Sequence, residues 1–152
     1  MQKIKIDYLS ALSLDQPFAH MICHLKMNVE SRNWTTKRRG TIAIHATAKT
    51  SKQEFEWVNR QFGLNLKPAD VDFASVIGIA DVVDVITEDQ VTKKTSKWFI
   101  GPYGFVLENI VLLPRAVPTK GNRKFWRLKG NALEQTLSQL TPTQLQQVRP
   151  FV

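Results

Sequence analysis

A long run of β-prone residues in the middle of the chain sets the strongest limit on the fold. The run FASVIGIADVVDVI, residues 73–86, is longer than most strands and contains Gly78 near its centre. β-branched residues favour the pleated surface of a sheet, whereas a glycine inside a strand typically marks a bend or a bulge. The run therefore predicts a small sheet that is sharply curved.

Other segments add strands and helices around this run. Residues 41–46 are predicted as a short strand, another strand follows the turn at Gly101–Pro102, and residues 124–128 form a last one. Apolar residues at helical spacing predict one helix over residues 18–25 and another from Ser51 to Gly63. Trp57 and Trp126 are interpreted as core residues. Two short helices are predicted near the C-terminus, beginning near Asn131 and at Thr141.

Composition indicates one globular domain of the α+β class. The chain has 152 residues, of which 43% are hydrophobic, enough for a single core. The N-terminal residues do not read as a signal peptide, and no run of eighteen apolar residues predicts a membrane span. A single cysteine, Cys23, excludes an internal disulfide and fits a reducing compartment, so we expect a cytoplasmic location and no membrane partner.

The charge is basic and unevenly distributed. The net charge is +8, residues 68–92 contain acidic but no basic residues, and residues 109–133 contain basic but no acidic residues. Charge separated in this way can fold into a positive face that attracts a phosphate backbone. The alternative is that the excess charge serves solubility alone.

The segment VESRNWTTKRRG, residues 29–40, is the main candidate for a binding site. Side chains alternate along an extended chain, so Glu30, Arg32 and Trp34 would share one face. A carboxylate can accept hydrogen bonds from a base, a guanidinium can hold a phosphate, and an indole can stack on a base. The alternative is a structural ion pair between Glu30 and Arg32, or between each of them and a neighbour, beside a core tryptophan.

Several ordered motifs resemble the activating-signal-cointegrator homology (ASCH) family. The family opens with Leu-Ser-Leu-x-Gln-Pro-aromatic-Ala. Its signature, Gly-x-Lys-x-x-Glu-x-Arg, is often followed by a tryptophan, then by a glycine and an Ile-His-Ala strand. This chain supplies, in that order, Gln16, Pro17, Phe18, Glu30, Arg32, Trp34, Gly40, Ile44, His45 and Ala46. Later matches, within a resemblance that covers residues 12–128, are Gly78, Asp81, Gly104, Glu108, Pro114, Lys120, Gly121 and Trp126.

The resemblance implies a PUA-like fold, a small β-barrel with flanking helices and a cleft beside the signature. We expect this domain to span residues 1–130, and the C-terminal helices predicted from the sequence pattern to form an extension, residues 131–152, that packs on the same domain. Members of this superfamily bind RNA, DNA or a modified nucleoside in the cleft. We therefore expect a nucleic-acid-binding module, with RNA or single-stranded DNA as its partner and with no metal or other cofactor.

Two departures from the signature bear on catalysis. Leu25 stands at the signature glycine and Met27 at the signature lysine, while Lys26 lies one place earlier. Similar small ASCH proteins hydrolyse acetylcytidine with that lysine, a threonine at the position of Glu30 and a later glutamate. The resemblance thus implies an alternative, a small amidohydrolase for an acylated or otherwise modified cytidine nucleoside that uses Lys26, Glu30 and Glu108. Binding is the favoured interpretation, because Lys26 would need a shift in register to reach the same place.

The predicted binding residues combine the signature, the basic turn after it and the later basic segment. They are Lys26, Glu30, Arg32, Trp34, Thr35, Lys37, Arg38, Arg39, His45, Tyr103, Lys120, Arg123 and Lys124. His45 is also interpreted as a core histidine, Tyr103 as a structural turn residue, and the later cations as a solvated face. His20 and His24 have metal-binding spacing but lack a third ligand at a motif spacing. A protein-interaction module, or a homodimer formed through the C-terminal helices, is a further hypothesis.

Overall fold

The computed structural model describes residues 5–152, which form an α+β fold around one six-stranded mixed sheet. The strands are β1 (Leu9–Leu14), β2 (Val29–Arg32), β3 (Gly40–Ala46), β4 (Ser75–Ile86), β5 (Tyr103–Pro118) and β6 (Phe125–Leu128). The α-helices are α1 (Phe18–Leu25), α2 (Lys52–Phe62), α3 (Gly130–Leu137) and α4 (Pro142–Gln146), and the 3₁₀ turns are η1 (Pro68–Asp70) and η2 (Glu88–Gln90). The predicted α+β class is confirmed.

The sheet is strongly curled, but its hydrogen-bonded ladder is open. The strand order is β2-β5-β4-β3-β1-β6, with β1 and β3 parallel and the other neighbours antiparallel. Within residues 5–152, β2 and β6 remain as edges, so the closed barrel that the resemblance implies is not confirmed. The two sides nevertheless approach each other, since the rings of Phe105 on β5 and Phe125 on β6 lie 6.1 Å apart.

Gly78 marks an irregularity in β4, as predicted. The register of β4 shifts between Val76 and Gly78 against β5, and the facing part of β3 shifts between Ile44 and His45. A Cβ atom added at Gly78 would lie 2.5 Å from the Cys23 sulfur on α1. The glycine therefore lets α1 pack directly against the bent strand.

Helix α1 lies against one face of the sheet and supplies much of the core. Met21, Ile22 and Cys23 are buried there in the same cluster as Phe105 on β5. A second apolar cluster, which includes Leu9 and Leu133, joins β1 to α3. No helix among residues 5–152 combines the length and the apolar character needed to cross a lipid bilayer.

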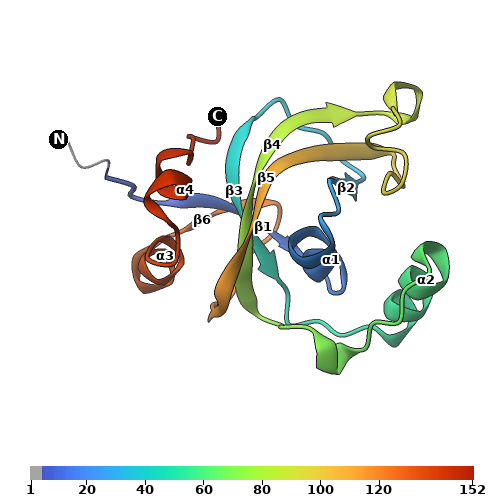
Figure 1. Ribbon diagram of the computed structural model, residues 1–152, viewed down its shortest axis with the longest axis horizontal. Coiled ribbons are helices and arrows are strands. Elements are labelled where there is room, and N and C mark those ends of the chain that lie inside the picture. The colour runs from blue at the N-terminus through green and yellow to red at the C-terminus, as the bar shows by residue number, and fades with distance from the viewer. Residues whose placement is uncertain (1–4) are drawn as a thin grey trace.

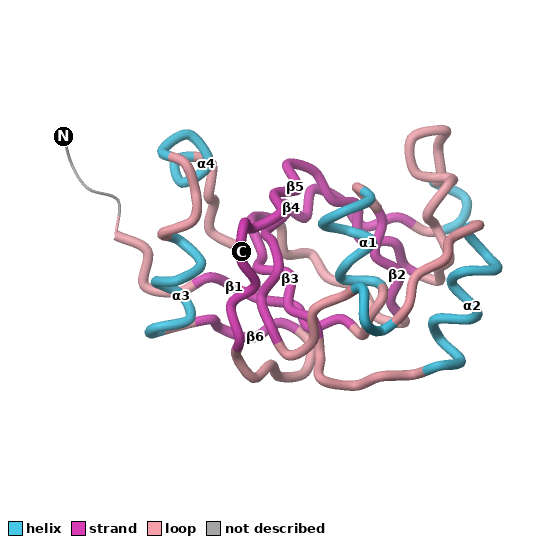
Figure 2. The backbone as a smooth tube through the Cα atoms, turned by 60° about the horizontal axis from the view of Figure 1, so that its bottom comes forward, coloured by secondary structure: helices cyan, strands magenta, loops and turns pink. Residues whose placement is uncertain are grey.

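Helix α2 stands at the opposite end of the molecule from α3 and α4 (Figures 1 and 2). Its first turn is capped by the Ser51 hydroxyl, which accepts a hydrogen bond from the Glu54 N–H at 3.2 Å, and Gly63 ends the helix with a left-handed φ of 65°. Phe55 and Val58 are buried, but Trp57 points away from them and is 38% exposed. The prediction that Trp57 is a core residue is wrong.

The C-terminal segment returns to the sheet after α4. The N–H of Val152 donates to the Arg39 carbonyl at 3.0 Å, and the Arg39 N–H donates to the Val152 carbonyl at 2.8 Å. Phe151 is buried in the main core cluster. Gly40 allows this contact, because it has a φ of 133° and an added Cβ atom would collide with the Pro150 carbonyl.

Candidate nucleic-acid interface

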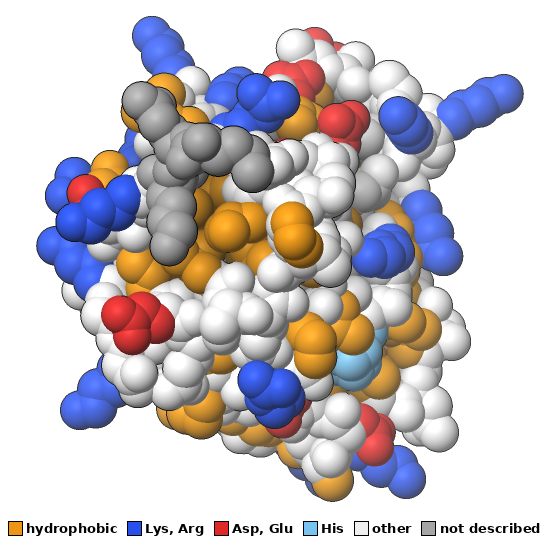
Figure 3. All heavy atoms as spheres, turned by 60° about the vertical axis from the view of Figure 1, so that its left-hand side comes forward, with side chains coloured by type: hydrophobic (Ala, Val, Ile, Leu, Met, Phe, Trp, Pro, Cys, Tyr) orange, Lys and Arg blue, Asp and Glu red, His pale blue; other side chains and the backbone are white. Residues whose placement is uncertain are grey.

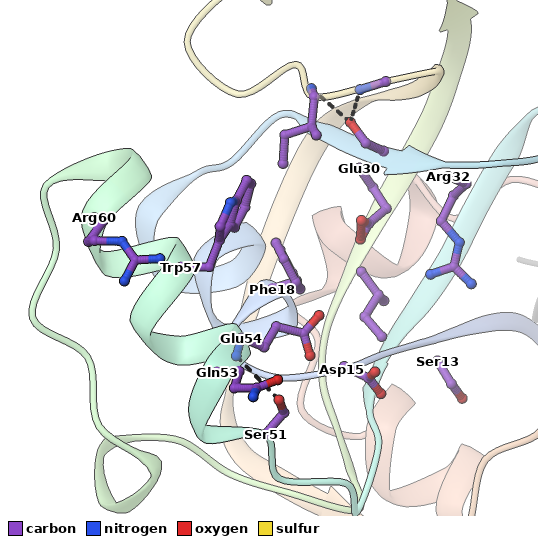
Figure 4. A pocket seen from close by; sticks show the side chains of 14 residues that line it. Ser13, Asp15, Phe18, Glu30, Arg32, Ser51, Gln53, Glu54, Trp57 and Arg60 are labelled. Atoms are coloured by element: carbon purple, nitrogen blue, oxygen red, sulfur yellow. Dashed lines mark hydrogen bonds between the residues drawn. The ribbon is translucent and has the colours of Figure 1, made fainter.

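A hollow of about 800 Å³ lies between β2 and α2. Its walls come from the end of β1, the start of α1, strand β2, helix α2 and the loop at residues 100–101. Figure 4 shows side chains from these elements directed into one space. The charged and aromatic residues that line it are Asp15, Phe18, Glu30, Arg32, Glu54, Trp57 and Arg60.

Glu30 is the most unusual of these residues. Strand β2 pairs it with Phe105 of β5, and the side chain is 6% exposed, with its carboxyl group directed into the pocket (Figure 4). Among residues 5–152 its Oε2 atom has no hydrogen-bond partner. A buried polar atom left in this state costs about 1–3 kcal/mol, so the carboxyl group is positioned to accept a partner from outside the protein.

Burial also changes the ionisation of Glu30. Loss of hydration raises the pKa of its carboxyl group to about 7, although the Arg32 guanidinium and the Ser31 N–H act to lower it. Asp15 and Glu54 raise it further by repulsion. In the part of the chain that the structure describes, Glu30 and Arg32 form no ion pair, which does not support the structural alternative.

The three residues predicted to share one face do not all reach the pocket. Arg32 lines it beside Glu30, but β2 ends at Arg32 and the chain bends at residues 33–34. Trp34 therefore packs edge-on against Phe105 and Phe125, at centroid distances of 5.1 and 5.3 Å. The Arg32 guanidinium and the Lys124 ammonium lie over the Trp34 ring, each 5.5 Å from its centre.

Trp57 brings the exposed aromatic ring to the pocket instead. It lies on α2, beside Phe18 of α1 in the pocket wall (Figure 4). The sequence pattern was interpreted as placing Trp57 in the core, although its position on the helix indicates an exposed side chain. Trp57 falls outside the apolar stripe of Phe55, Val58 and Phe62, so helical spacing alone places it on the other side of α2.

The residues of the hydrolase hypothesis lie apart from one another. The Lys26 ammonium donates to the Ile110 carbonyl at 3.0 Å, and Glu108 is exposed on β5 opposite Asp81. The carboxyl groups that accompany Glu30 in the pocket are those of Asp15 and Glu54. Burial, followed by the charge of Asp15, raises the pKa of Glu54.

Two cations of the predicted basic turn have structural contacts. The Arg38 guanidinium lies 4.4 Å from the centre of the Phe151 ring and donates to the Phe151 carbonyl at 3.1 Å. Arg39 donates to the Thr36 carbonyl at 3.0 Å and lies 3.8 Å from Asp84. Thr35, Lys37 and Arg38 itself are exposed in the same turn.

A second hollow, of about 430 Å³, contains more of the predicted residues. Lys120 and Arg123 line it together with His45 and Ser13. The Trp126 indole N–H donates to the Ser13 hydroxyl at 2.9 Å, and Ser13 lies 2.9 Å from Nδ1 of His45. Nε2 of His45 lies 2.8 Å from the Thr119 carbonyl, which can accept but not donate. The neutral ring with its proton on Nε2 satisfies every contact, so the Ser13 hydroxyl donates to Nδ1.

His45 is thus buried and held by its neighbours, as its core interpretation predicted. Burial lowers its pKa, although the contact with the Thr119 backbone opposes this effect.

Tyr103 lines a different hollow, beside Thr87 and Pro102. Among the described residues, no group of three or more His, Cys, Asp or Glu side chains is arranged to hold a metal ion, and the rings of His20 and His24 stack 4.1 Å apart.

Comparison with known proteins identifies the domain. No family model matches the chain. Activating signal cointegrator 1 from Homo sapiens is 32% identical over 127 residues, and the protein of the same name from Mus musculus is 30% identical over 127 residues. Each match covers 77% of this chain but 22% of the relative, so the chain spans about a fifth of the length of these proteins. The chain is therefore homologous to a part of activating signal cointegrator 1 and contains an ASCH-like domain.

Proposed function

We propose that this domain binds single-stranded nucleic acid, RNA or single-stranded DNA, by admitting a base into the pocket between β2 and α2. The observation that carries the proposal is the buried Glu30 carboxyl group, whose Oε2 atom lacks a partner among residues 5–152 and is directed into that pocket. Trp57 offers an exposed ring on which a base can stack, and Arg32 offers a cation next to Glu30.

The positions of the cations support a path for the phosphate backbone. Arg32 and Arg60 lie at the first pocket, and Lys120 and Arg123 lie at the second. Ser13 borders both, so the two hollows are neighbours. A strand with one base beside Trp57 would carry its next phosphates past Ser13 toward Lys120 and Arg123. Such contacts contribute the salt-dependent part of the affinity.

Substitution of the stacking residue tests the proposal. Stacking contributes about 1–3 kcal/mol for each base, so Trp57→Ala should weaken binding of a fluorescent single-stranded nonamer by about 5- to 150-fold. Tyr8→Ala is a matched control, because Tyr8 has the same 38% exposure and lies just before β1, outside the pocket lining. Fluorescence anisotropy measures both affinities. Equal affinities for the two variants would remove the pocket from the interface.

A further inference from the structure

We propose that the pocket selects a guanine-type base, one that presents two adjacent N–H donors on its Watson–Crick edge. This inference rests on the proposed function and specifies its ligand. It follows from the distribution of hydrogen-bond donors and acceptors in the pocket.

Hydrogen-bond acceptors converge in the interior of the pocket. Glu30 reaches it from β2, Glu54 from α2 and Asp15 from the segment after β1 (Figure 4). Asp15 is already engaged, since it accepts from the Thr47 hydroxyl at 2.7 Å and lies 3.7 Å from the Lys49 ammonium. Glu54 forms no ion pair with any residue from 5 to 152, and Oε2 of Glu30 lacks a partner over the same range.

Several donors near these carboxyl groups are committed or lie toward the rim, while the exposed Gln53 amide and the Ser51 hydroxyl also line the pocket beside Glu54. The Ser13 hydroxyl donates to His45, as described above. Arg32 also faces the Trp34 ring, and Arg60 is exposed on α2. The Ser31 hydroxyl accepts from the N–H groups of Ile100 and Gly101, at 3.0 Å each, and so fixes the loop that closes this side. A base that enters the pocket therefore lies against the carboxyl groups of Glu30 and Glu54.

The edge of guanine complements this arrangement better than the edges of the other bases. Guanine presents its ring N1–H beside its N2 amino group, so two carboxyl oxygens can each accept one hydrogen bond. Adenine and cytosine place an unprotonated ring nitrogen beside the amino group, and that nitrogen would face an ionised carboxylate without a proton between them. Uracil has one N–H between two carbonyl oxygens. The pocket therefore disfavours adenine, cytosine and uracil, because each would place an unmatched acceptor against a carboxyl group.

The ionisation of Glu30 sets the pH at which this choice can be tested. Burial raises its pKa to about 7, so an assay at pH 8 presents the carboxylate form that accepts from N1–H. Arg32 faces Glu30 from the same strand, Glu54 faces it from α2, and Asp15 from the end of β1. A bound donor replaces the hydration that Glu30 loses in the pocket.

The test compares four RNA nonamers that differ at the central position of a uridine chain, which carries guanosine, inosine, adenosine or uridine. At pH 8 we expect the guanosine chain to bind about tenfold more tightly than the adenosine and uridine chains, a typical effect of a hydrogen bond to a charged group. Inosine retains N1–H but lacks the amino group, so its affinity should fall between those of guanosine and adenosine.

Two variants connect the preference to the carboxyl groups. Glu30→Gln and Glu54→Gln should each reduce the guanosine preference, whereas Glu56→Gln, an exposed carboxylate on the same helix outside the pocket, should leave it unchanged. Equal binding of all four chains by the natural protein would overturn the inference and leave the proposed function intact. A guanosine preference that both pocket variants retain would also overturn it. Failure of every RNA chain, and of single-stranded DNA nonamers of the same sequences, to bind would instead refute the proposed function itself.

Discussion

The ligand-binding role proposed for Glu30 comes at a cost to the stability of the fold. Its carboxyl group is buried on a strand, and its pKa is raised from an ordinary 4.5 to about 7. The folded protein therefore holds a proton on Glu30 between these pH values, whereas the unfolded chain has lost it. Stability contributed by this residue is present below pH 4.5 and is lost as the pH rises through 7.

Glu30→Gln tests this effect, because glutamine cannot ionise. The free energy of unfolding of the natural protein should fall, relative to that of the variant, by about 3 kcal/mol between pH 4.5 and pH 8, since one pKa unit corresponds to about 1.4 kcal/mol. Urea denaturation at several pH values measures the difference. Parallel stability curves for the two proteins would show that Glu30 ionises at its ordinary pKa.

At the scale of elements, two glycines offer a contrast in what the backbone requires. Gly40 and Gly63 both have a positive φ, of 133° and 65°. An added Cβ atom at Gly40 would collide with the Pro150 carbonyl, whereas at Gly63 nothing lies within 4 Å. Gly40→Ala should therefore displace the C-terminal segment from β3, but Gly63→Ala should add only the modest strain of a left-handed alanine.

We expect Gly63→Ala to lower the free energy of unfolding by about 1 kcal/mol and Gly40→Ala to lower it by more than 2 kcal/mol. Urea denaturation of both variants measures the two costs. Hydrogen exchange at the Val152 amide, which donates to the Arg39 carbonyl, should become faster in the Gly40 variant alone. Equal losses of stability would show that the close contact with Pro150 does not matter.

The basic turn after β2 gives a further prediction at this scale. The sequence predicts that Arg38 and Arg39 contact phosphate, but the structure places them against Phe151 and Asp84, while Arg32 and Arg60 line the pocket. Arg32→Ala and Arg60→Ala should each reduce the slope of log affinity against log salt by about 0.7, the value for one single-strand phosphate contact.

Arg38→Ala separates the two accounts of the turn. In the structural account it lowers the free energy of unfolding and leaves the salt slope close to that of the natural protein. Arg115→Ala, an exposed arginine on β5 outside the pocket lining, serves as the control for a change in net charge. A reduced salt slope for Arg38→Ala, with no such reduction for Arg32→Ala, would show that the basic turn, and not the pocket, contacts phosphate.

Sequence patterns predicted individual elements well, because those patterns are local. The Ser51 cap, the Gly63 end of α2 and the irregularity at Gly78 all follow from neighbouring residues.

The lining of the candidate pocket between β2 and α2 was predicted in part. Glu30 and Arg32 do share the pocket, but Trp34 turns away because its ring packs on Phe105 and Phe125, which are distant in sequence. The docking of α2 likewise depends on tertiary packing, so helical spacing places Trp57 outside the apolar stripe of α2 but does not predict that it borders the pocket.

At the scale of the whole molecule, the face drawn in Figure 3 carries basic side chains that are spread rather than gathered. Figure 3 shows Lys and Arg side chains scattered around the edge of one face, with apolar side chains between them. If the proposed function is correct, we expect specific binding to depend on the pocket between β2 and α2 rather than on this face. Helices α3 and α4 lie at the end away from the pocket, and pairing of two copies through them remains a prediction (Figure 1).

An NMR titration of the ¹⁵N-labelled protein with a guanosine-containing single-stranded nonamer tests the central claim most directly. We expect the largest changes in backbone amide shifts at residues 30–32 and 51–60 and at the loop of residues 100–101, which together border the pocket. Smaller changes should extend to residues 120–123 at the neighbouring hollow. Changes confined to α3, α4 or the basic turn, with the amides of Glu30 and Trp57 unmoved, would contradict the account.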